Sequence, residues 1–513
     1  MSQRESTNRS VTPTKGSRSA SPAAVPTLEK GVGVDEAGRD IDPVIERSAL
    51  YKTDFIIIPI VGMYYFLSFL DRSNIGNARI AGLTKDLKMS ANQFSTALTV
   101  TYVPYIVMEL PMNLIMKRYG ANVTLPTMVV LWGMHVASGG LFPGITLYLS
   151  QFYKRHNLQL RFSMMFSVTS LAGAFSGLLA AAIENMNGIR GLPGWAWIFI
   201  LEGLFTTVFG LVSWFIIPAT PADMPLLSKA EKETYTRALV QDWSGDSDAD
   251  GTASEVFSWS EVWGTFTNAP HVLLLCLPLF FNGVTLYGLA NFTPTIVNAL
   301  GFSTAKTQLL TVPPYACSFV VSIVCSYFSD VYKMRGPMAI LVSLISAAGY
   351  AIFIGTPIHS DSIQVVSISR RSAGTNSKHA DYAALFLQII GVYSAAPCLS
   401  TWNANNVQPH YRRATAVAMA FIATNAGGIV STWIFLDPPR FHIACSVDLA
   451  FSLGIAAFSA LVMVLFKRWN ADKAREVERL LSEKGEGKEP GGWDSVEERQ
   501  RLGDRHPRFE YTL

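Results

Sequence analysis

Charged residues are scarce in this chain of 513 residues. Asp, Glu, Lys and Arg make up only 15% of it, where soluble domains contain about 25%. They concentrate in residues 1–54, 218–260 and 467–513, and the stretches between contain apolar runs of the length that a membrane-crossing helix needs, about 20 residues for about 30 Å of hydrocarbon. The sequence therefore predicts a polytopic membrane protein. Its net charge of +3 is too small to indicate a nucleic-acid partner.

Cysteines and catalytic motifs are equally scarce. The five cysteines show no CxxC spacing, and four of them lie within apolar stretches, which predicts packing roles rather than disulfides or a metal site. The eight histidines are scattered, and the sequence contains no P-loop, H-E-x-x-H or G-x-S-x-G pattern. We therefore expect no enzyme activity, no cofactor and no bound metal.

The apolar spans fall into two groups. Residues 1–54, rich in Ser, Thr, Pro and Arg, predict a disordered tail without a cleavable signal peptide. Spans then fill residues 55–217 and 271–466, separated by the polar stretch 218–270 and followed by a polar tail at 467–513. We expect an N-terminal helix bundle, a central linker and a C-terminal helix bundle.

Basic residues in short loops indicate the orientation of the chain. Lys and Arg beside short loops mark the cytoplasmic side of a membrane protein. The basic pairs at 117–118, 154–155 and 412–413 all face the cytoplasm if both termini are cytoplasmic and the number of crossings is even. The pair at 370–371 breaks this pattern, because it would lie in an external loop.

Corresponding loops of the two halves resemble each other. NLIMKRYG (113–120) follows the second span of the first half, and SYFSDVYKMRG (326–336) follows the second span of the other half. FYKRHNLQLR (152–161) similarly matches QPHYRRAT (408–415). Weak internal repetition is typical of transporters built from two related halves, with the site between them near mid-membrane depth.

Seven stretches, covering most of residues 50–470, carry a family resemblance. They are FLDRSNIGNARIAGL, GLFPGITLYLSQFYKR, SLAGAFSGLLAAAI, GWAWIFILEG, YGLANFTPTIVNALGFS, LLTVPPY and NNVQPHYRRATAVA. The chain resembles fungal major facilitator superfamily transporters of the anion:cation symporter group, the allantoate, nicotinate and pantothenate permeases. The resemblance implies an all-α membrane protein with the major facilitator fold, two pseudo-symmetric six-helix bundles. It also implies proton-coupled uptake of a small organic anion.

Asp71 and Arg72 are adjacent charges in the first apolar span. A guanidinium within a span costs roughly 2.5–3.5 kcal/mol on insertion scales, so it tends to face a cavity and a partner. Its planar fork matches a carboxylate, which points to an anionic substrate for Arg72. The alternative is a residue that reaches to the membrane interface and pairs only with Asp71. Related families use this pair for coupling and anion binding, so the resemblance implies that Asp71 takes part in proton coupling.

Further polar residues are candidates for the same site. Asn74 lies three residues after Asp71 and can share part of a helix face with Asp71 or Arg72, so we expect it either to contact substrate or to mark the helix end. Tyr287 and Asn291 lie at i and i+4, so they share one helix face, and Pro294 follows them. They either line a cavity or join neighbouring helices. For Glu202 we expect a structural role.

A loop in the second half resembles the superfamily's cytoplasmic gate signature. There an acidic residue, Asp330, is followed by Lys333 and Arg335. The resemblance implies that these three residues lock the inward-facing gate. The corresponding loop of the first half, NLIMKRYG, lacks the acidic residue, so its gate uses other partners.

The third and fourth spans are too short. Residues 123–153 lie between two basic pairs on one side of the membrane, yet as helix they rise only about 46 Å, while two crossings need about 60 Å. WGMHVASGGLFPG omits the family's intervening loop and its fourth-helix Arg, and puts Ser138 where a family Glu aligns. Three explanations stay open: a misjoined coding sequence, an altered or inactive transporter, and a shallow re-entrant hairpin. The polar, basic stretch 359–379 is a second departure, consistent with the first explanation.

These observations support one leading hypothesis. The chain imports a small carboxylate nutrient such as nicotinate, pantothenate or allantoate with protons, in a fungal plasma membrane, by alternating access. Its partners are the anion, protons and the lipid bilayer, with a monomer as the default state. The alternative is a membrane sensor that binds such a ligand without transporting it, or an inactive variant of the same fold.

Overall fold

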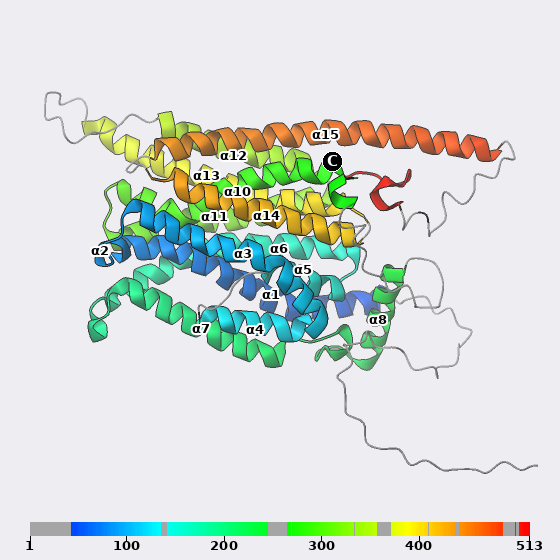
Figure 1. The fold of residues 1–513 in the computed structure, drawn as a ribbon, viewed down its shortest axis with the longest axis horizontal. Coiled ribbons are helices and arrows are strands. Elements are labelled where there is room, and N and C mark those ends of the chain that lie inside the picture. The colour runs from blue at the N-terminus through cyan, green and yellow to red at the C-terminus, as the bar shows by residue number, and fades with distance from the viewer. Residues whose placement is uncertain are drawn as a thin grey trace, which may run out of the picture.

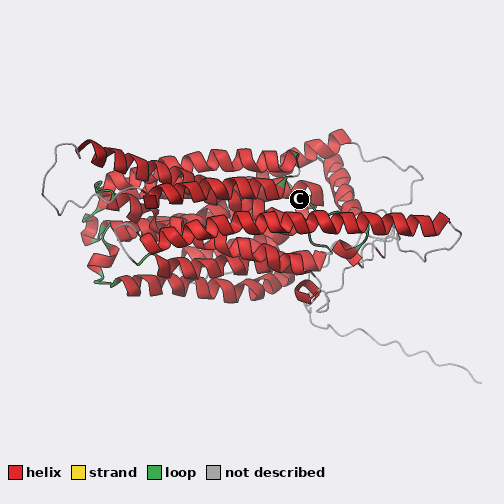
Figure 2. Cartoon of the chain, turned by 90° about the horizontal axis from the view of Figure 1, so that it is seen from above, coloured by secondary structure: helices red, strands yellow, loops and turns green. Residues whose placement is uncertain are grey.

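The computed structural model describes residues 43–134, 141–244, 264–267, 269–332, 334–355, 371–408, 410–436, 441–485, 498 and 502–513. All regular secondary structure in these residues is helical, and the long helices run side by side along one axis (Figures 1 and 2). Nine helices in this described part are long and apolar enough to cross a membrane. The all-helical prediction is thereby confirmed.

The helices form two groups that follow each other in the chain. The first group consists of α1 (Pro43–Ile80), α2 (Leu83–Asp86), α3 (Ala91–Tyr119), α4 (Ala121–Gly133), α5 (Leu141–Phe152), α6 (Arg155–Ile183) and α7 (Gly194–Ile216). The linker contains α8 (Lys229–Ser244). The second group consists of α10 (Pro270–Ala299), α11 (Thr304–Val331), α12 (Arg335–Gly355), α13 (Arg371–Asn405), α14 (His410–Ile434) and α15 (His442–Gly485). Between the groups, α6 packs on α11, α3 on α14 and α1 on α10.

Both ends of the described chain lie at the same end of the molecule. α1 begins there, α8 packs against it, and the last residues return to the same end (Figure 1). We call this the linker end and the opposite one the far end. α1 starts at residue 43, so residues 43–54, expected to belong to a disordered tail, form its first turns. Pro43 at its start suits a helix, because a proline there loses no intrahelical hydrogen bond.

Ion pairs fix the start of α1 to its neighbours. Lys52 lies 2.8 Å from Glu231 of α8, and Asp54 pairs with Arg161 of α6. The hydrogen bond from Lys52, with further bonds from the Ser228 backbone and the Ser48 hydroxyl, lowers the pKa of Glu231 to about 2. The linker is therefore attached to the first bundle at α1 and α8.

Helices α4 and α5 are short, as the spacing of residues 123–153 predicts. They contain 13 and 12 residues, so each rises only about 20 Å, less than the roughly 30 Å of a bilayer core. Ser138 lies between them, outside the described residues. The basic stretch 359–379 is described only from residue 371, where the backbone already belongs to α13.

Candidate functional site

Asp71 and Arg72 point to different neighbours although they are adjacent. Successive residues of an α-helix are about 100° apart around its axis, because a turn takes 3.6 residues. Asp71 accepts a hydrogen bond from Trp132 Nε1 of α4 at 3.0 Å, inside the first bundle. Arg72 instead reaches across the bundle interface to Tyr287 of α10. One helix thus supplies a carboxylate to its own bundle and a guanidinium to the space between the bundles.

The guanidinium of Arg72 is surrounded by aromatic side chains. Its Nη1 donates to the Tyr287 hydroxyl at 2.6 Å, and that hydroxyl donates to Asn425 Oδ1 of α14 at 2.9 Å. Its carbon Cζ lies 4.3 Å from the ring centroid of Tyr105 and 5.1 Å from that of Tyr287. Within the described residues, no carboxylate forms an ion pair with this guanidinium. Cation–π contacts stabilise the charge without filling the remaining N–H donors.

A cavity adjoins this cluster on its linker-end side. It is small, with only about 20 Å³ open to water, and both bundles line it. Its residues are Tyr65, Phe69, Phe166 and Thr169 from the first bundle and Leu279, Asn282, Leu286, Tyr287, Ala396, Ser400, Phe421 and Thr424 from the second. A mostly apolar wall with a few polar groups is typical of a small-molecule site. Tyr287 belongs to both the cavity and the Arg72 cluster, so it joins the two.

Contacts close the interface on both sides of the cavity. Toward the linker end, the rings of Phe166 and Phe421 stack with their centroids 6.2 Å apart. Toward the far end, Asn291 donates to the Tyr102 hydroxyl at 3.3 Å, and a Cβ on Gly76 would lie 2.4 Å from the Asn291 carbonyl oxygen. The cavity is therefore bounded along the bundle axis by contacts between the two bundles.

The structure separates the four residues that we expected to contact substrate. Tyr287 and Arg72 are together at the cavity. Asn291 is buried in the far-end closure, one turn beyond Tyr287. Asn74 is buried inside the first bundle, where its amide donates to Glu202 of α7.

Two carboxylates lie close together in the first bundle. Glu202, which is buried, accepts from Asn74 at one oxygen and interacts electrostatically with Asp71. Its other oxygen, Oε1, is buried without a hydrogen-bond partner in the described part of the chain. Two acids in one buried site do not readily ionise together, because their charges repel. This arrangement suits a site that binds and releases a proton.

The expected gate residues lie at the linker end of the second bundle. Asp330, at the end of α11, forms an ion pair with Arg335, the first residue of α12. Arg335 also donates to Ser329 Oγ at 3.2 Å and is buried. Lys333 lies outside the described residues. The pair thus joins two helices of one bundle.

Sequence reasoning missed several members of the site. Tyr102 and Tyr105 lie at i and i+3 in TYVPY of α3, and Asn425 lies in ATNAGG of α14. Polar residues in these apolar stretches were the available signal. These polar residues belong to the site because they make contacts across the bundle interface, and a single sequence does not reveal such contacts.

Comparison with known proteins places this geometry in a family. A sequence profile of the Major Facilitator Superfamily matches residues 134–432. An uncharacterised transporter of Schizosaccharomyces pombe is 32% identical, with 84% of this chain and 85% of that protein aligned. The high-affinity nicotinic acid transporter of Saccharomyces cerevisiae is 30% identical, with 91% of this chain and 85% of that protein aligned.

Solved structures share the fold at low sequence identity. A crystal structure of a D-xylose-proton symporter matches with a TM-score of 0.58 at 13% identity, covering 79% of this chain and 97% of that one. An inward-facing bacterial homologue of the lysosomal transporter Spinster matches with a TM-score of 0.55 at 15% identity, covering 80% and 97%. The expected two-bundle fold is thereby confirmed, and the chain belongs to the Major Facilitator Superfamily.

Proposed function

We propose that this chain is a secondary active transporter that imports a small organic anion with protons, by alternating access. The observation that supports it most is the Arg72 guanidinium beside the cavity, held by tyrosines and, among the described residues, without an ion-paired carboxylate. A charged group at this depth is costly unless a partner compensates it. A substrate carboxylate would supply that partner, and the guanidinium fork would bind it with two hydrogen bonds.

The cavity and the relatives favour a small, flat acid. In this closed state the cavity leaves only about 20 Å³ open to water, room for about one water molecule, so a substrate would enter a more open state. The aromatic walls of the cavity, including Tyr65, Phe69 and Phe166, suit a ring. The similarity to a nicotinic acid transporter adds nicotinate as the first substrate to test, with pantothenate and allantoate next.

Proton coupling would use the two carboxylates of the first bundle. Asp71 and Arg72 share one helix turn, so a change in the anion bound to Arg72 shifts the local field at Asp71. Glu202 interacts with Asp71, and we propose that the pair shares one transported proton. In this account Tyr287 fixes Arg72 toward the cavity, and Asn291 belongs to the far-end gate. Asn74 orients Glu202 rather than touching substrate.

The proposal also assigns the two ends of the molecule to the two sides of the membrane. The linker end carries α8 and the Asp330–Arg335 pair, and the basic short loops at 117–118 and 154–155 are expected on the same side. We propose that this end is cytoplasmic, with both termini there, in a fungal plasma membrane. The Asp330–Arg335 pair would then belong to the inward-facing gate.

Uptake by cells that express the chain tests the proposal. We expect saturable accumulation of labelled nicotinate that collapses when a protonophore is added. Labelled nicotinamide, a neutral analogue of the same shape, is the matched control and should not accumulate. Equal uptake of the acid and the amide would contradict the role of Arg72.

A sensor that binds the anion without transporting it is the second candidate. The short α4 and α5 favour it, because neither helix spans the hydrocarbon core. Binding of nicotinate to purified protein, with no accumulation in cells, would support the sensor over the transporter.

A further inference from the structure

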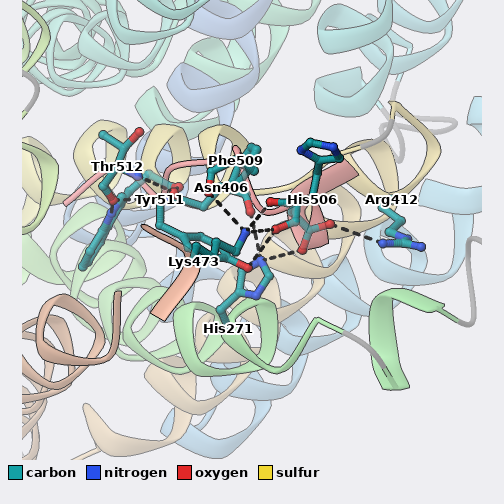
Figure 3. A network of polar contacts seen from close by, with 10 residues as sticks. His271, Asn406, Arg412, Lys473, His506, Phe509, Tyr511 and Thr512 are labelled. Atoms are coloured by element: carbon teal, nitrogen blue, oxygen red, sulfur yellow. Dashed lines mark hydrogen bonds and ion pairs between the residues drawn. The ribbon is translucent and has the colours of Figure 1, made fainter. Parts of the chain in front are cut away.

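The last residues of the chain occupy a specific binding site at the linker end. Residues 502–513, which we call the C-terminal strap, pack against the ends of the second bundle (Figure 3). Asp504 and His506 of this segment are buried, with 1% and 2% of their surface exposed. Burying a charged and a polar side chain is unfavourable unless both find partners. The strap therefore occupies a specific site rather than covering the surface loosely.

Three side chains hold the backbone of the strap. Lys473 of α15 directs its ammonium group to the carbonyl oxygens of Asp504, His506 and Phe509, which uses all three donors that a lysine has. Asn470, one turn earlier, pairs with both the N–H and the carbonyl of Tyr511 at 2.8 Å each.

Asn406, just after α13, repeats this pairing with the next residue. Its amide accepts from the Thr512 N–H at 2.7 Å and donates to the Thr512 carbonyl at 3.3 Å. Paired amide contacts of this kind bind an extended segment through its backbone, independently of side chains.

Side-chain contacts add selectivity. Asp504 pairs with Arg412 of α14 at 3.3 Å and lies 3.7 Å from the His271 ring of α10. The Tyr511 ring stacks on Phe466, with centroids 4.8 Å apart, and contacts His271 edge-on at 5.3 Å. The site thus recognises an acidic residue and, seven positions later, an aromatic one.

The strap joins five helices. Besides α10, α13, α14 and α15, it reaches α12, because the Leu513 carbonyl oxygen accepts from the backbone N–H of Arg335 at 2.8 Å. Three of these helices, α10, α13 and α14, also line the cavity. Ser400 of α13 lies two residues before Trp402, whose indole donates to Thr512 at 2.8 Å. Phe421, which closes the cavity toward the linker end, follows Arg412 on α14 by about 14 Å of helix.

We propose that the C-terminal strap is a reversible latch whose docking holds the linker ends of α13 and α14 in place and so restrains opening of the cavity toward that end. To open, the wall that carries Phe421 must move relative to α10 and α15. The docked strap opposes that movement, because its contacts with these helices must break. Release of the strap frees the α14 end and loosens the Phe166–Phe421 closure.

Thiol labelling of purified protein tests the latch without any substrate. Ser400→Cys is introduced into a background in which the five native cysteines are alanine, and its labelling rate is compared with and without residues 502–513. We expect deletion to raise the rate at least threefold, and a synthetic peptide of residues 502–513 to restore the slow rate. Asn92→Cys, exposed at the far end, is the matched control and should not respond.

Two further measurements allow the latch to be tested even if the deletion impairs folding. If the deleted protein does not fold, Asp504→Ala in the full chain should raise Ser400→Cys labelling, because it removes the Arg412 partner and leaves the backbone contacts. A peptide carrying the same Asp504→Ala change should bind the deletion variant at least fivefold more weakly than the native peptide. Unchanged Ser400→Cys labelling in both the deletion and the Asp504→Ala protein would overturn the proposal, as would a native peptide that does not bind.

Discussion

Arg72 of α1 and Tyr287 of α10 meet across the bundle interface, with 2.6 Å between the guanidinium Nη1 and the phenol oxygen. The Tyr287 hydroxyl in turn donates to Asn425, so one tyrosine fixes the guanidinium and connects it with α14. Because the proposed alternating access requires the two bundles to move relative to each other, we expect this hydrogen bond to form in some states and to break in others. The predictions below start from this contact.

Replacing Arg72 by lysine should impair uptake although it preserves the charge. Lysine offers a compact ammonium in place of the planar fork, so it loses the paired hydrogen bonds to a carboxylate. We expect uptake at low nicotinate concentration to fall at least tenfold, about 1.4 kcal/mol. Arg79→Lys is the matched control. It changes the same group on the same helix, and the Arg79 guanidinium lies over the rings of Phe94 and Phe292, away from the cavity. Equal losses in the two variants would contradict an anion-binding role for Arg72.

Tyr287→Phe should raise KM for nicotinate about five- to tenfold, because neutral hydrogen bonds contribute about 1 kcal/mol and bonds to charged groups more. The change removes only the hydroxyl, so the ring still packs on Tyr102 and Phe69. Tyr148→Phe removes another buried hydroxyl, which bonds the Pro218 carbonyl. It should lower Tm without changing KM. If Tyr148→Phe raised KM as much as Tyr287→Phe, the effect would be general destabilisation.

Gly76→Ala should block closure of the far end. The added Cβ would lie 2.4 Å from the Asn291 carbonyl oxygen of the opposite bundle, closer than any normal contact. We expect uptake to fall more than tenfold while the folded protein still accumulates in the membrane, because a state in which the bundles are apart avoids the clash. Gly62→Ala on the same helix meets only Val168, at 3.9 Å, and should transport normally. Normal uptake by Gly76→Ala would show that transport does not require this closure.

The lowered pKa of Glu231 predicts that the attachment of the linker weakens at acidic pH. Its pKa is lowered to about 2 in the folded protein, from about 4.3 in an unfolded chain. The contribution to stability is therefore present above about pH 4 and is lost as the pH falls toward 2. The Tm of purified protein should exceed that of Glu231→Gln by a few degrees at pH 6, and this difference should shrink below pH 4. The exposed Glu233 of the same helix is the control, and Glu233→Gln should leave Tm unchanged at both pH values.

The sequence was sufficient for the architecture because membrane helices are predicted from apolar length alone. The short α4 and α5 followed from arithmetic on residues 123–153. The ends of the chain were harder to predict. Residues 43–54 and 502–513 are polar and were predicted to belong to tails. However, α1 begins at Pro43, and the strap docks through individual side-chain and backbone contacts to residues scattered over five helices. Such contacts leave no periodic pattern.

The candidate site, too, could be predicted from the sequence only in part. Arg72 and Tyr287 could be named because a charge and a helical i, i+4 pair are visible within local sequence. That Asn74 faces Glu202, while Arg72 faces Tyr287, depends on which helices lie next to α1. Spacing along one helix states which residues share a face but not what that face meets.

Transport by purified protein in liposomes tests the central claim most directly. The protein is reconstituted, a pH gradient is imposed with the interior alkaline, and entry of labelled nicotinate is followed with and without a protonophore. We predict accumulation above the external concentration that the protonophore abolishes and that Arg72→Ala lacks. Folded protein that carries nicotinate, pantothenate and allantoate no faster than empty liposomes would contradict the account, as would accumulation that Arg72→Ala leaves intact.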